Sequence, residues 1–312
     1  MRPVIIAGSA HVALAEDLAR ELECEMASCP PRRFPDGEQD VEIQSSVRGD
    51  PVFVVQPLVH PVGEHLLELL LIADACRRAG ARSITAVVPY MGFARQDRVT
   101  REGSPLGARV VANVLGTGAL SQVIAVDLHS PVVASCVDAP VAHLTAVPAI
   151  VEALRRHVRE DSVVVAPDLG AVKLADAYAR RLTLPLAVVY KIRSSPTEVA
   201  ARRVAGDVRG KRPVLVDDMI STGSTIDAAV GALMDQGSRR EVLVAATHGV
   251  FVEGAPERLD RPELVRVTIT DTLPARSHPP ARLEVVRLAP LLAEAVRRIV
   301  SERGLDDLLA AR

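Results

Sequence analysis

Short apolar runs rich in Val, Ile and Leu alternate along this chain with longer segments whose apolar residues recur at helical spacing. Runs with so few polar positions are typical of strands buried on both faces, as in a parallel sheet wrapped by helices. One series precedes His143 and a similar one follows it, which predicts an α/β fold with two similar halves. The predicted strands are Val4 to Ala7, Val52 to Val55, Ile84 to Val88, Val123 to Val126, Val163 to Ala166, Leu186 to Val189, Val214 to Val216, Val242 to Ala245 and Val267 to Ile269.

Four segments between or after these runs have the periodicity of helices. The clearest covers residues 63–81, with Gly80 as its C-terminal stop. Its predicted apolar face consists of Leu66, Leu67, Leu69, Leu70, Leu71 and Ala73. Further helices are predicted within 169–182, 224–237 and 288–304. We expect a first domain over 1–146, a second over 147–286, and a C-terminal helix within about 287–312 that packs back on the first domain.

Composition narrows the class of ligand. The chain has 312 residues, 48% of them hydrophobic, and a net charge of −2 with acids and bases interspersed, so it lacks the basic footprint of a nucleic-acid-binding protein. The four cysteines show neither CxxC spacing nor a dense framework, which argues against structural zinc and against a disulfide scaffold. No leader-like N-terminus and no run of about 18 apolar residues is present, so we expect a cytoplasmic protein that acts on a small molecule away from membranes.

The segment PVLVDDMISTGST, residues 213–225, carries the strongest chemical signal. An apolar run leads to Asp217 and Asp218, which we expect to lie at the carboxyl end of a strand, where α/β folds bind ligands. The short residues that follow open a helix whose N-terminus favours an anion. Carboxylates repel phosphate, so their partners are hydroxyls or a divalent cation, and the segment predicts a clamp for a sugar phosphate. A strand, turn and helix cap without a ligand is the alternative. The loop residues are Ser221, Thr222, Gly223, Ser224 and Thr225.

Two further segments have the composition of a nucleotide site. YMGFARQDR follows a predicted strand, and two guanidiniums beside an amide suit a polyphosphate and a planar base. The stretch 101–104 after it has the composition of a mobile flap. FPDGE places an aromatic beside acids in a chain with only seven aromatic residues, so Phe34 is predicted to stack on a base. A solvated loop and a local apolar contact are the respective alternatives. The polar residues involved are Arg95, Gln96, Asp97, Arg98, Asp36 and Glu38.

Single residues at other strand ends complete the set. His129 and Asp168 occupy matching positions after strands in the two halves, and together they form a sparse but workable ligand pair for a hard divalent cation. Lys191 and Arg193 alternate along an extended segment, which puts both cations on one side, where they would stabilise charge on a transferred phosphoryl group. A structural histidine and a surface ion pair are the competing interpretations.

Taken together and in this order, the motifs FPDGE, GFARQDR, AVDLHS, VAPDLGAVKLADAYA, YKIR, VLVDDMISTGST and THGVF resemble those of the ribose-phosphate diphosphokinase family, over nearly the whole chain. The resemblance implies two tandem phosphoribosyltransferase-like domains. It also implies transfer of the β,γ-diphosphoryl group of ATP to the 1-hydroxyl of ribose 5-phosphate, with Mg²⁺ as cofactor. In that family the FPDGE turn reaches a neighbouring subunit, so a homo-oligomer is implied.

The resemblance also assigns residues. It implies that Lys191 and Arg193 are catalytic residues and that His129 and Asp168 bind the metal. The residues that it assigns to ATP binding are Phe34, Asp36, Gly37, Glu38, Arg95, Gln96, Asp97 and Arg98. The residues that it assigns to ribose 5-phosphate binding are Arg193, Asp217, Asp218, Ser221, Thr222, Gly223, Ser224 and Thr225.

The chain departs from many family members in three places: the segment after RQDR, the serines at 221 and 224, and a tail without the Ser-rich, Phe-terminated ending linked to ADP regulation. Two other functions fit parts of the pattern. A phosphoribosyltransferase would consume the product but needs no second half, and a non-catalytic regulatory homologue would have lost the catalytic residues that are present here.

Overall fold

The computed structural model describes residues 2–192 and 201–310, with the backbone alone at 191, 192, 201 and 202. The contacts divide the chain into two compact units. Unit 1 comprises Met1–Thr145, Thr272–Pro274 and Leu288–Arg312, and unit 2 comprises Ala146–Asp271 and Ala275–Arg287. Arg193, one of the predicted catalytic residues, lies outside the described residues.

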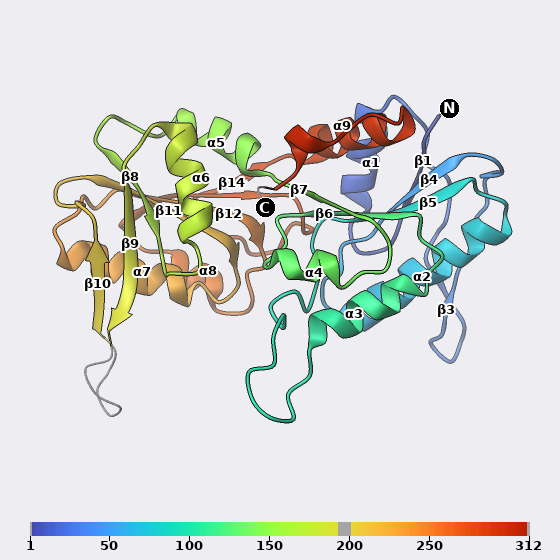
Figure 1. Cartoon of the computed structure of the whole chain (residues 1–312), viewed down its shortest axis with the longest axis horizontal. Coiled ribbons are helices and arrows are strands. Elements are labelled where there is room, and N and C mark those ends of the chain that lie inside the picture. Colours follow the sequence, from blue (N-terminus) through green and yellow to red (C-terminus); the bar gives the residue numbers. More distant parts are fainter. Residues whose placement is uncertain (1, 193–200, 311–312) are drawn as a thin grey trace. The chain divides into compact units, whose positions relative to one another are not determined.

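Unit 1 is built on a sheet of five parallel strands in the order β1-β4-β5-β6-β7 (Figure 1). Its central strands are buried along nearly their whole length, as expected for a parallel sheet covered on both faces. The strands are β1 (Val4–Ala7), β4 (Pro51–Val55), β5 (Ser83–Val88), β6 (Gln122–Val126) and β7 (Val141–Leu144). A separate two-stranded hairpin consists of β2 (Arg32–Arg33) and β3 (Gln39–Asp40).

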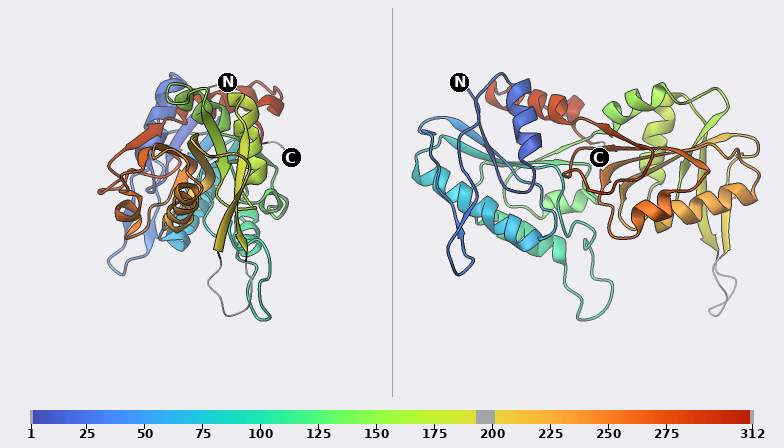
Figure 2. Two further views of the ribbon diagram at one scale, coloured as in Figure 1. Left: turned by 90° about the vertical axis from the view of Figure 1, so that its left-hand side faces the viewer. Right: turned by 180° about the vertical axis from the view of Figure 1, so that it is seen from behind.

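Helices cover both faces of this sheet. On one face, α1 (Val12–Glu21) packs beside the C-terminal helix α9 (Ala289–Val300), and on the other lie α2 (Val62–Arg78) and α3 (Gly107–Gly116) (Figures 1 and 2). Two short elements, α4 (Pro131–Ser135) and the 3₁₀ turn η1 (Asp306–Leu308), complete the unit. Since side chains alternate across a strand, each face of the sheet contributes its own set of Val, Ile and Ala to the two helix layers.

The buried face of α2 differs from the predicted one and also includes Ile72 and Cys76. Leu67 is exposed, whereas Glu68 is buried with 6% of its surface accessible. The Glu68 carboxylate accepts hydrogen bonds from the backbone N–H and hydroxyl of Ser9 and from Nε2 of Gln56, at 3.0, 2.6 and 2.6 Å. These bonds offset the cost of burying the acid, which a hydrophobicity pattern does not register.

Unit 2 has a seven-stranded sheet in the order β10-β9-β8-β11-β12-β13-β14, parallel except for the antiparallel β10–β9 pair. The helices α5 (Val147–Arg155) and α6 (Val172–Leu182) cover one face, and α7 (Ser224–Asp235) and α8 (Ala255–Leu259) cover the other (Figure 1). The strands are β8 (Ser162–Ala166), β9 (Leu186–Ile192), β10 (Ala201–Ala205), β11 (Arg212–Ile220), β12 (Val242–Gly249), β13 (Leu264–Thr270) and β14 (Leu283–Val286).

The predicted α/β fold is confirmed, and every predicted strand is present. Asp217 and Asp218 lie towards the carboxyl end of β11, as expected, although the strand continues beyond the predicted Val216 and through both acids to Ile220. On one side β11 pairs with β12 as far as Ile220, whereas its pairing with β8 on the other side ends at Leu215. The two acids therefore lie in the part of β11 that extends beyond its pairing with β8. No helix among the described residues is long and apolar enough to span a bilayer.

Candidate active site

Three carboxylates lie near one another in unit 2, at the carboxyl end of β8 and in the extended part of β11. Asp168 follows β8, and Asp217 and Asp218 lie on β11. The backbone N–H of Asp218 donates to Oδ1 of Asp217 at 2.9 Å. Because β8 and β11 pair in parallel, their carboxyl ends lie at the same end of the sheet. This explains why residues almost fifty positions apart in sequence are neighbours there.

The environment of Asp217 disfavours its ionised form. Burial, reinforced by the neighbouring charges of Asp218 and Asp168, raises the pKa of Asp217 to about 8. A hydrogen bond from the backbone of Asp218 opposes this shift without cancelling it. A carboxyl group held in this way is poised to ionise when a cation approaches or to bond a ligand hydroxyl.

The loop after β11 opens a helix, as the predicted phosphate cup requires. Gly223 has φ +73°, a conformation that glycine adopts without strain, and it is the N-cap of the twelve-residue helix α7. Thr222 Oγ1 lies 2.8 Å from Ser224 Oγ and accepts a bond from the N–H of Ser224 at 3.3 Å. The loop thus combines two hydroxyls with the positive end of a helix, a combination that suits a phosphate monoester.

One residue that the sequence reasoning missed supports this cup. Nη1 of Arg258, at the end of α8, donates to the backbone carbonyl of Thr222 at 2.6 Å. The bond fixes that carbonyl and brings an exposed guanidinium to the loop. The only signal in the sequence is a single arginine in a short helix far along the chain, because α8 meets α7 only in the folded unit.

Lys191 belongs to β9, where its backbone is paired with Arg202 of the antiparallel neighbour β10. The predicted strand stopped at Val189, so the structure extends it through the lysine. The catalytic roles of Lys191 and Arg193 remain predictions, as does their placement on one side of the segment.

His129 and Asp168 each follow a strand, as predicted, but they belong to different units. His129 is exposed and comes shortly after β6. Oδ1 of Asp168 accepts the backbone N–H groups of Gly170 and Ala171 at 2.8 and 3.2 Å, so this acid also shapes the entry to α6. Within residues 2–192 and 201–310, no set of three or more His, Cys, Asp or Glu side chains is arranged to hold a metal ion. The joint metal site remains a prediction.

The FPDGE segment forms the tip of the β2–β3 hairpin. The N–H of Gly37 donates to the carbonyl of Phe34, and the N–H of Glu38 donates to Oδ1 of Asp36, which defines a tight turn at φ +94° for Gly37. Phe34 is 51% exposed and is therefore not a core residue. Arg33 ties the turn to α2, since its Nη1 donates to Gly37 O at 2.9 Å and its Nη2 pairs with Glu64 at 2.5 Å.

The RQDR segment lies in a loop between β5 and α3. The N–H of Gln96 donates to the carbonyl of Phe93, and the N–H of Ala108 in α3 donates to the carbonyl of Gln96. Arg95, Gln96 and Arg98 are exposed and Asp97 is half-buried. Phe93, which the sequence reasoning left out, is 45% exposed and has φ +64°. A strained, exposed aromatic directly before two arginines is a further candidate for contact with a base.

The predicted ATP residues fall into two groups that one chain keeps apart. The β2–β3 hairpin and the loop between β5 and α3 protrude from unit 1 at separate places in every view (Figures 1 and 2). Within unit 1, the two predicted ATP-binding segments therefore belong to separate protrusions.

Comparison with known proteins agrees with the motifs. Residues 3–118 match the model of the N-terminal domain of ribose phosphate pyrophosphokinase, and residues 192–310 match that of the phosphoribosyl synthetase-associated domain. The chain is 41% identical over 305 residues to a ribose-phosphate pyrophosphokinase of Aquifex aeolicus, covering 97% of this chain and 98% of that protein. It is 42% identical to the enzyme of that name from Corynebacterium efficiens, covering 98% and 95%.

A solved structure extends the agreement to the fold. The crystal structure of phosphoribosylpyrophosphate synthetase from Mycobacterium smegmatis superposes with a TM-score of 0.90 and 38% identity, covering 97% of this chain and all of that one. Identity of this extent over almost the full length of each protein confirms the resemblance drawn from the motifs, and the chain belongs to the ribose-phosphate pyrophosphokinase family.

Proposed function

We propose that the chain is an active, cytoplasmic ribose-phosphate diphosphokinase that serves nucleotide biosynthesis by converting ATP and ribose 5-phosphate to phosphoribosyl diphosphate (PRPP) and AMP. The observation that carries this proposal is the assembly in unit 2 of the carboxylates Asp168, Asp217 and Asp218 beside the hydroxyl-rich loop that opens α7. A sugar phosphate presents both chemistries at once, hydroxyls at one end and a dianion at the other.

Ribose 5-phosphate is positioned by its two ends. The 5-phosphate fits the cup of residues 221–225, where the hydroxyls of Thr222 and Ser224 and the first N–H groups of α7 donate to its oxygens. Asp217 and Asp218 then accept hydrogen bonds from ring hydroxyls and fix the 1-hydroxyl in line with the β-phosphorus of ATP. Positioning of this kind supplies much of the rate of a phosphoryl transfer.

The residues at this sheet edge fit Mg²⁺. Burial and the charges of Asp218 and Asp168 raise the pKa of Asp217 to about 8, and a divalent cation is the kind of charge that would stabilise the ionised carboxylate. Asp168 and, from unit 1, His129 would hold the metal on ATP, with waters and phosphate oxygens as its remaining ligands. When bound, Mg²⁺ neutralises charge on the polyphosphate and on the departing AMP.

Bond changes follow from this arrangement. The 1-hydroxyl oxygen of ribose 5-phosphate forms a bond to the β-phosphorus of ATP and releases its proton to solvent, while the bond from that phosphorus to the α,β-bridging oxygen breaks and AMP leaves with the bridging oxygen and its electron pair. Lys191 and Arg193 stabilise the negative charge that develops on the transferred group, a contribution that is largest in the transition state.

The ATP base is held by residues from two copies of the chain. The hairpin bearing Phe34, Asp36, Gly37 and Glu38 protrudes apart from the loop bearing Arg95, Gln96, Asp97 and Arg98. A homo-oligomer in which the hairpin of one subunit reaches the loop of its neighbour would unite them, with Phe34 stacked on adenine.

Incubation of the purified chain with ATP, ribose 5-phosphate and Mg²⁺ tests the proposal, with products separated by anion-exchange chromatography. We expect AMP and PRPP in equal amounts, each dependent on both substrates. A phosphoribosyltransferase would instead form no AMP and would consume PRPP when a base is supplied. A regulatory homologue would release nothing when assayed alone. Either of these results rejects the proposal.

A further inference from the structure

The backbone that carries His129 changes direction sharply after β6. The N–H of Asp127 still donates to the carbonyl of Leu144 on β7, at 3.0 Å, and so prolongs the sheet by one bond. Asp127 itself has φ +37°, an uncommon conformation for a non-glycine residue, and one that Asp tolerates better than most. Asp127 and Leu128 are buried, whereas His129 is exposed.

The side chain of His143 supplies the next bond. The backbone N–H of Leu128 donates to Nε2 of His143 at 2.8 Å. Because a backbone N–H can only donate, Nε2 must accept, which requires a neutral imidazole with its hydrogen on Nδ1. His143 is opposite Ala125 on the paired strand, so its ring reaches past the end of β6 to the turn. The bond fixes the peptide immediately before His129.

The C-terminal segment holds the strand that bears His143. The N–H of Ala310 donates to the carbonyl of His143 and the N–H of Thr145 donates to the carbonyl of Leu308, at 2.8 and 3.0 Å. Leu309 forms an antiparallel bridge with Leu144. The backbone of β7 is therefore paired with β6 on one side and with the chain terminus on the other.

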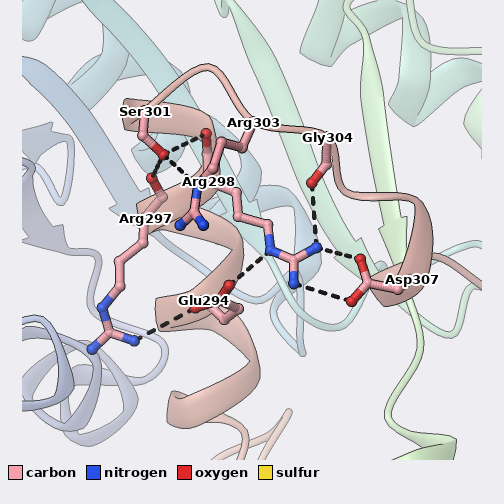
Figure 3. Close-up of polar contacts among 7 residues, drawn as sticks. All are labelled: Glu294, Arg297, Arg298, Ser301, Arg303, Gly304 and Asp307. Carbon is pink, nitrogen blue, oxygen red and sulfur yellow. Dashed lines mark hydrogen bonds and ion pairs between the residues drawn. The ribbon is translucent and has the colours of Figure 1, made fainter.

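An arginine at the end of α9 anchors that segment. Arg298 pairs with both carboxylate oxygens of Asp307, donates to Glu294 at 2.7 Å, and donates to the carbonyl of Gly304 at 3.3 Å (Figure 3). Its side chain is only 18% exposed, and it has a partner for each direction of its planar fork. The contacts fix residues 304–307 on α9 and so deliver residues 308–310 to β7.

We propose that His143 is a positioning residue for His129. We also propose that the segment 304–310 holds strand β7, which bears His143, on the side opposite β6. The inference rests on the proposed role of His129 in holding the metal on ATP. His143 acts through one bond to the peptide N–H of Leu128, which holds the turn at Asp127 and thereby the direction in which the His129 side chain leaves the backbone. The role resembles that of residues behind metal ligands, whose loss typically weakens metal binding 10- to 100-fold.

The test measures the dissociation constant of Mn²⁺ by electron paramagnetic resonance, with the full-length chain and a non-hydrolysable ATP analogue. We expect His143→Ala to weaken Mn²⁺ binding about tenfold. His143→Gln, whose Oε1 can replace Nε2 as the acceptor, should remain within about threefold of the parent. The KM for ribose 5-phosphate should not change in either variant. His278→Ala, in an exposed loop of unit 2, is the matched control.

A double-mutant cycle tests separately whether His129 binds the metal and whether His143 acts through His129. If His143 acts through His129, then His143→Ala should add nothing to the loss caused by His129→Ala. Normal Mn²⁺ binding by His129→Ala would reject the metal role of His129 and the inference with it. A weakened His129→Ala beside a normal His143→Ala, or two losses that multiply, would overturn the positioning role alone.

If His143→Ala fails to fold, a second variant tests the role of the segment 304–310. Asp307→Asn weakens the anchor on Arg298 and leaves His143 in place. We expect it to weaken Mn²⁺ binding two- to fivefold, and unchanged binding in this variant would reject the role of 304–310.

Discussion

Replacement of Asp217 by Asn should stabilise the ligand-free protein above neutral pH. The carboxyl group has its pKa raised from 3.8 to about 8, first by burial and then by Asp218 and Asp168. The folded chain therefore keeps a proton on Asp217 that the unfolded chain has already lost, so the stability of the wild-type protein falls as pH rises from about 4 to about 8. An amide at this position carries no charge and does not take part in this loss.

The size of the effect follows from the shift. A change of about 4 pKa units corresponds to at most about 6 kcal/mol at about 1.4 kcal/mol per unit. Solvation of a half-buried carboxylate and local relaxation reduce this, and we expect about 2 kcal/mol at pH 8.5. For a unit of this size that is a rise of about 4–8 °C in the unfolding temperature. Asn keeps the Oδ1 atom that accepts the N–H of Asp218, so the local geometry should persist.

Thermal unfolding monitored by circular dichroism at pH 5, 7 and 8.5, without metal or nucleotide, provides the measurement. The difference between Asp217→Asn and the wild type should be small at pH 5 and should grow towards pH 8.5. Asp235→Asn, exposed at the end of α7, is the control, and should change stability by less than about 0.5 kcal/mol at each pH. Parallel pH curves for the wild type and Asp217→Asn would refute the reasoning.

Three other substitutions test separate parts of the site by steady-state kinetics. Arg258→Ala removes the bond to the carbonyl of Thr222 and should raise the KM for ribose 5-phosphate about 3- to 10-fold, with Arg258→Lys less affected; an unchanged KM would remove Arg258 from the cup. Glu64→Ala releases Arg33 and the hairpin, and since exposed ion pairs contribute at most about 1 kcal/mol, the KM for ATP should rise no more than about fivefold while that for ribose 5-phosphate stays constant. Lys191→Ala should lower kcat by about 10³-fold with little change in either KM, and a normal kcat would contradict a transition-state role.

The fold was predictable because its main signal is local. Each buried parallel strand forms a continuous apolar run, and the helices between the strands have their own period, as at α2 and α7. Short edge elements were missed: β7, β10, β14 and the two-residue strands β2 and β3 have mixed or polar sequences, because an edge strand or a protruding hairpin buries less of its surface.

The sequence could indicate local geometry where the candidate residues are adjacent, as in the loop from Ser221 to Thr225, which opens α7 as expected. Contacts between distant segments were not predictable. Arg258 reaches Thr222 only because α8 packs on α7, and His143 reaches Leu128 only because β6 and β7 pair in one register. The raised pKa of Asp217 likewise depends on Asp168, which the β8–β11 pairing brings close. Such relations arise from packing, and no local pattern encodes them.

The proposed reaction requires that the 1-hydroxyl oxygen of ribose 5-phosphate attacks the β-phosphorus of ATP. Ribose 5-phosphate labelled with ¹⁸O at that hydroxyl tests it directly, with the products analysed by mass spectrometry soon after mixing. We expect PRPP to retain the label as the oxygen between C1 and the β-phosphorus, and AMP to contain none. PRPP formed without the label would mean that the C1–oxygen bond breaks instead, as it does when a phosphoribosyltransferase displaces a group from C1, and would contradict the account.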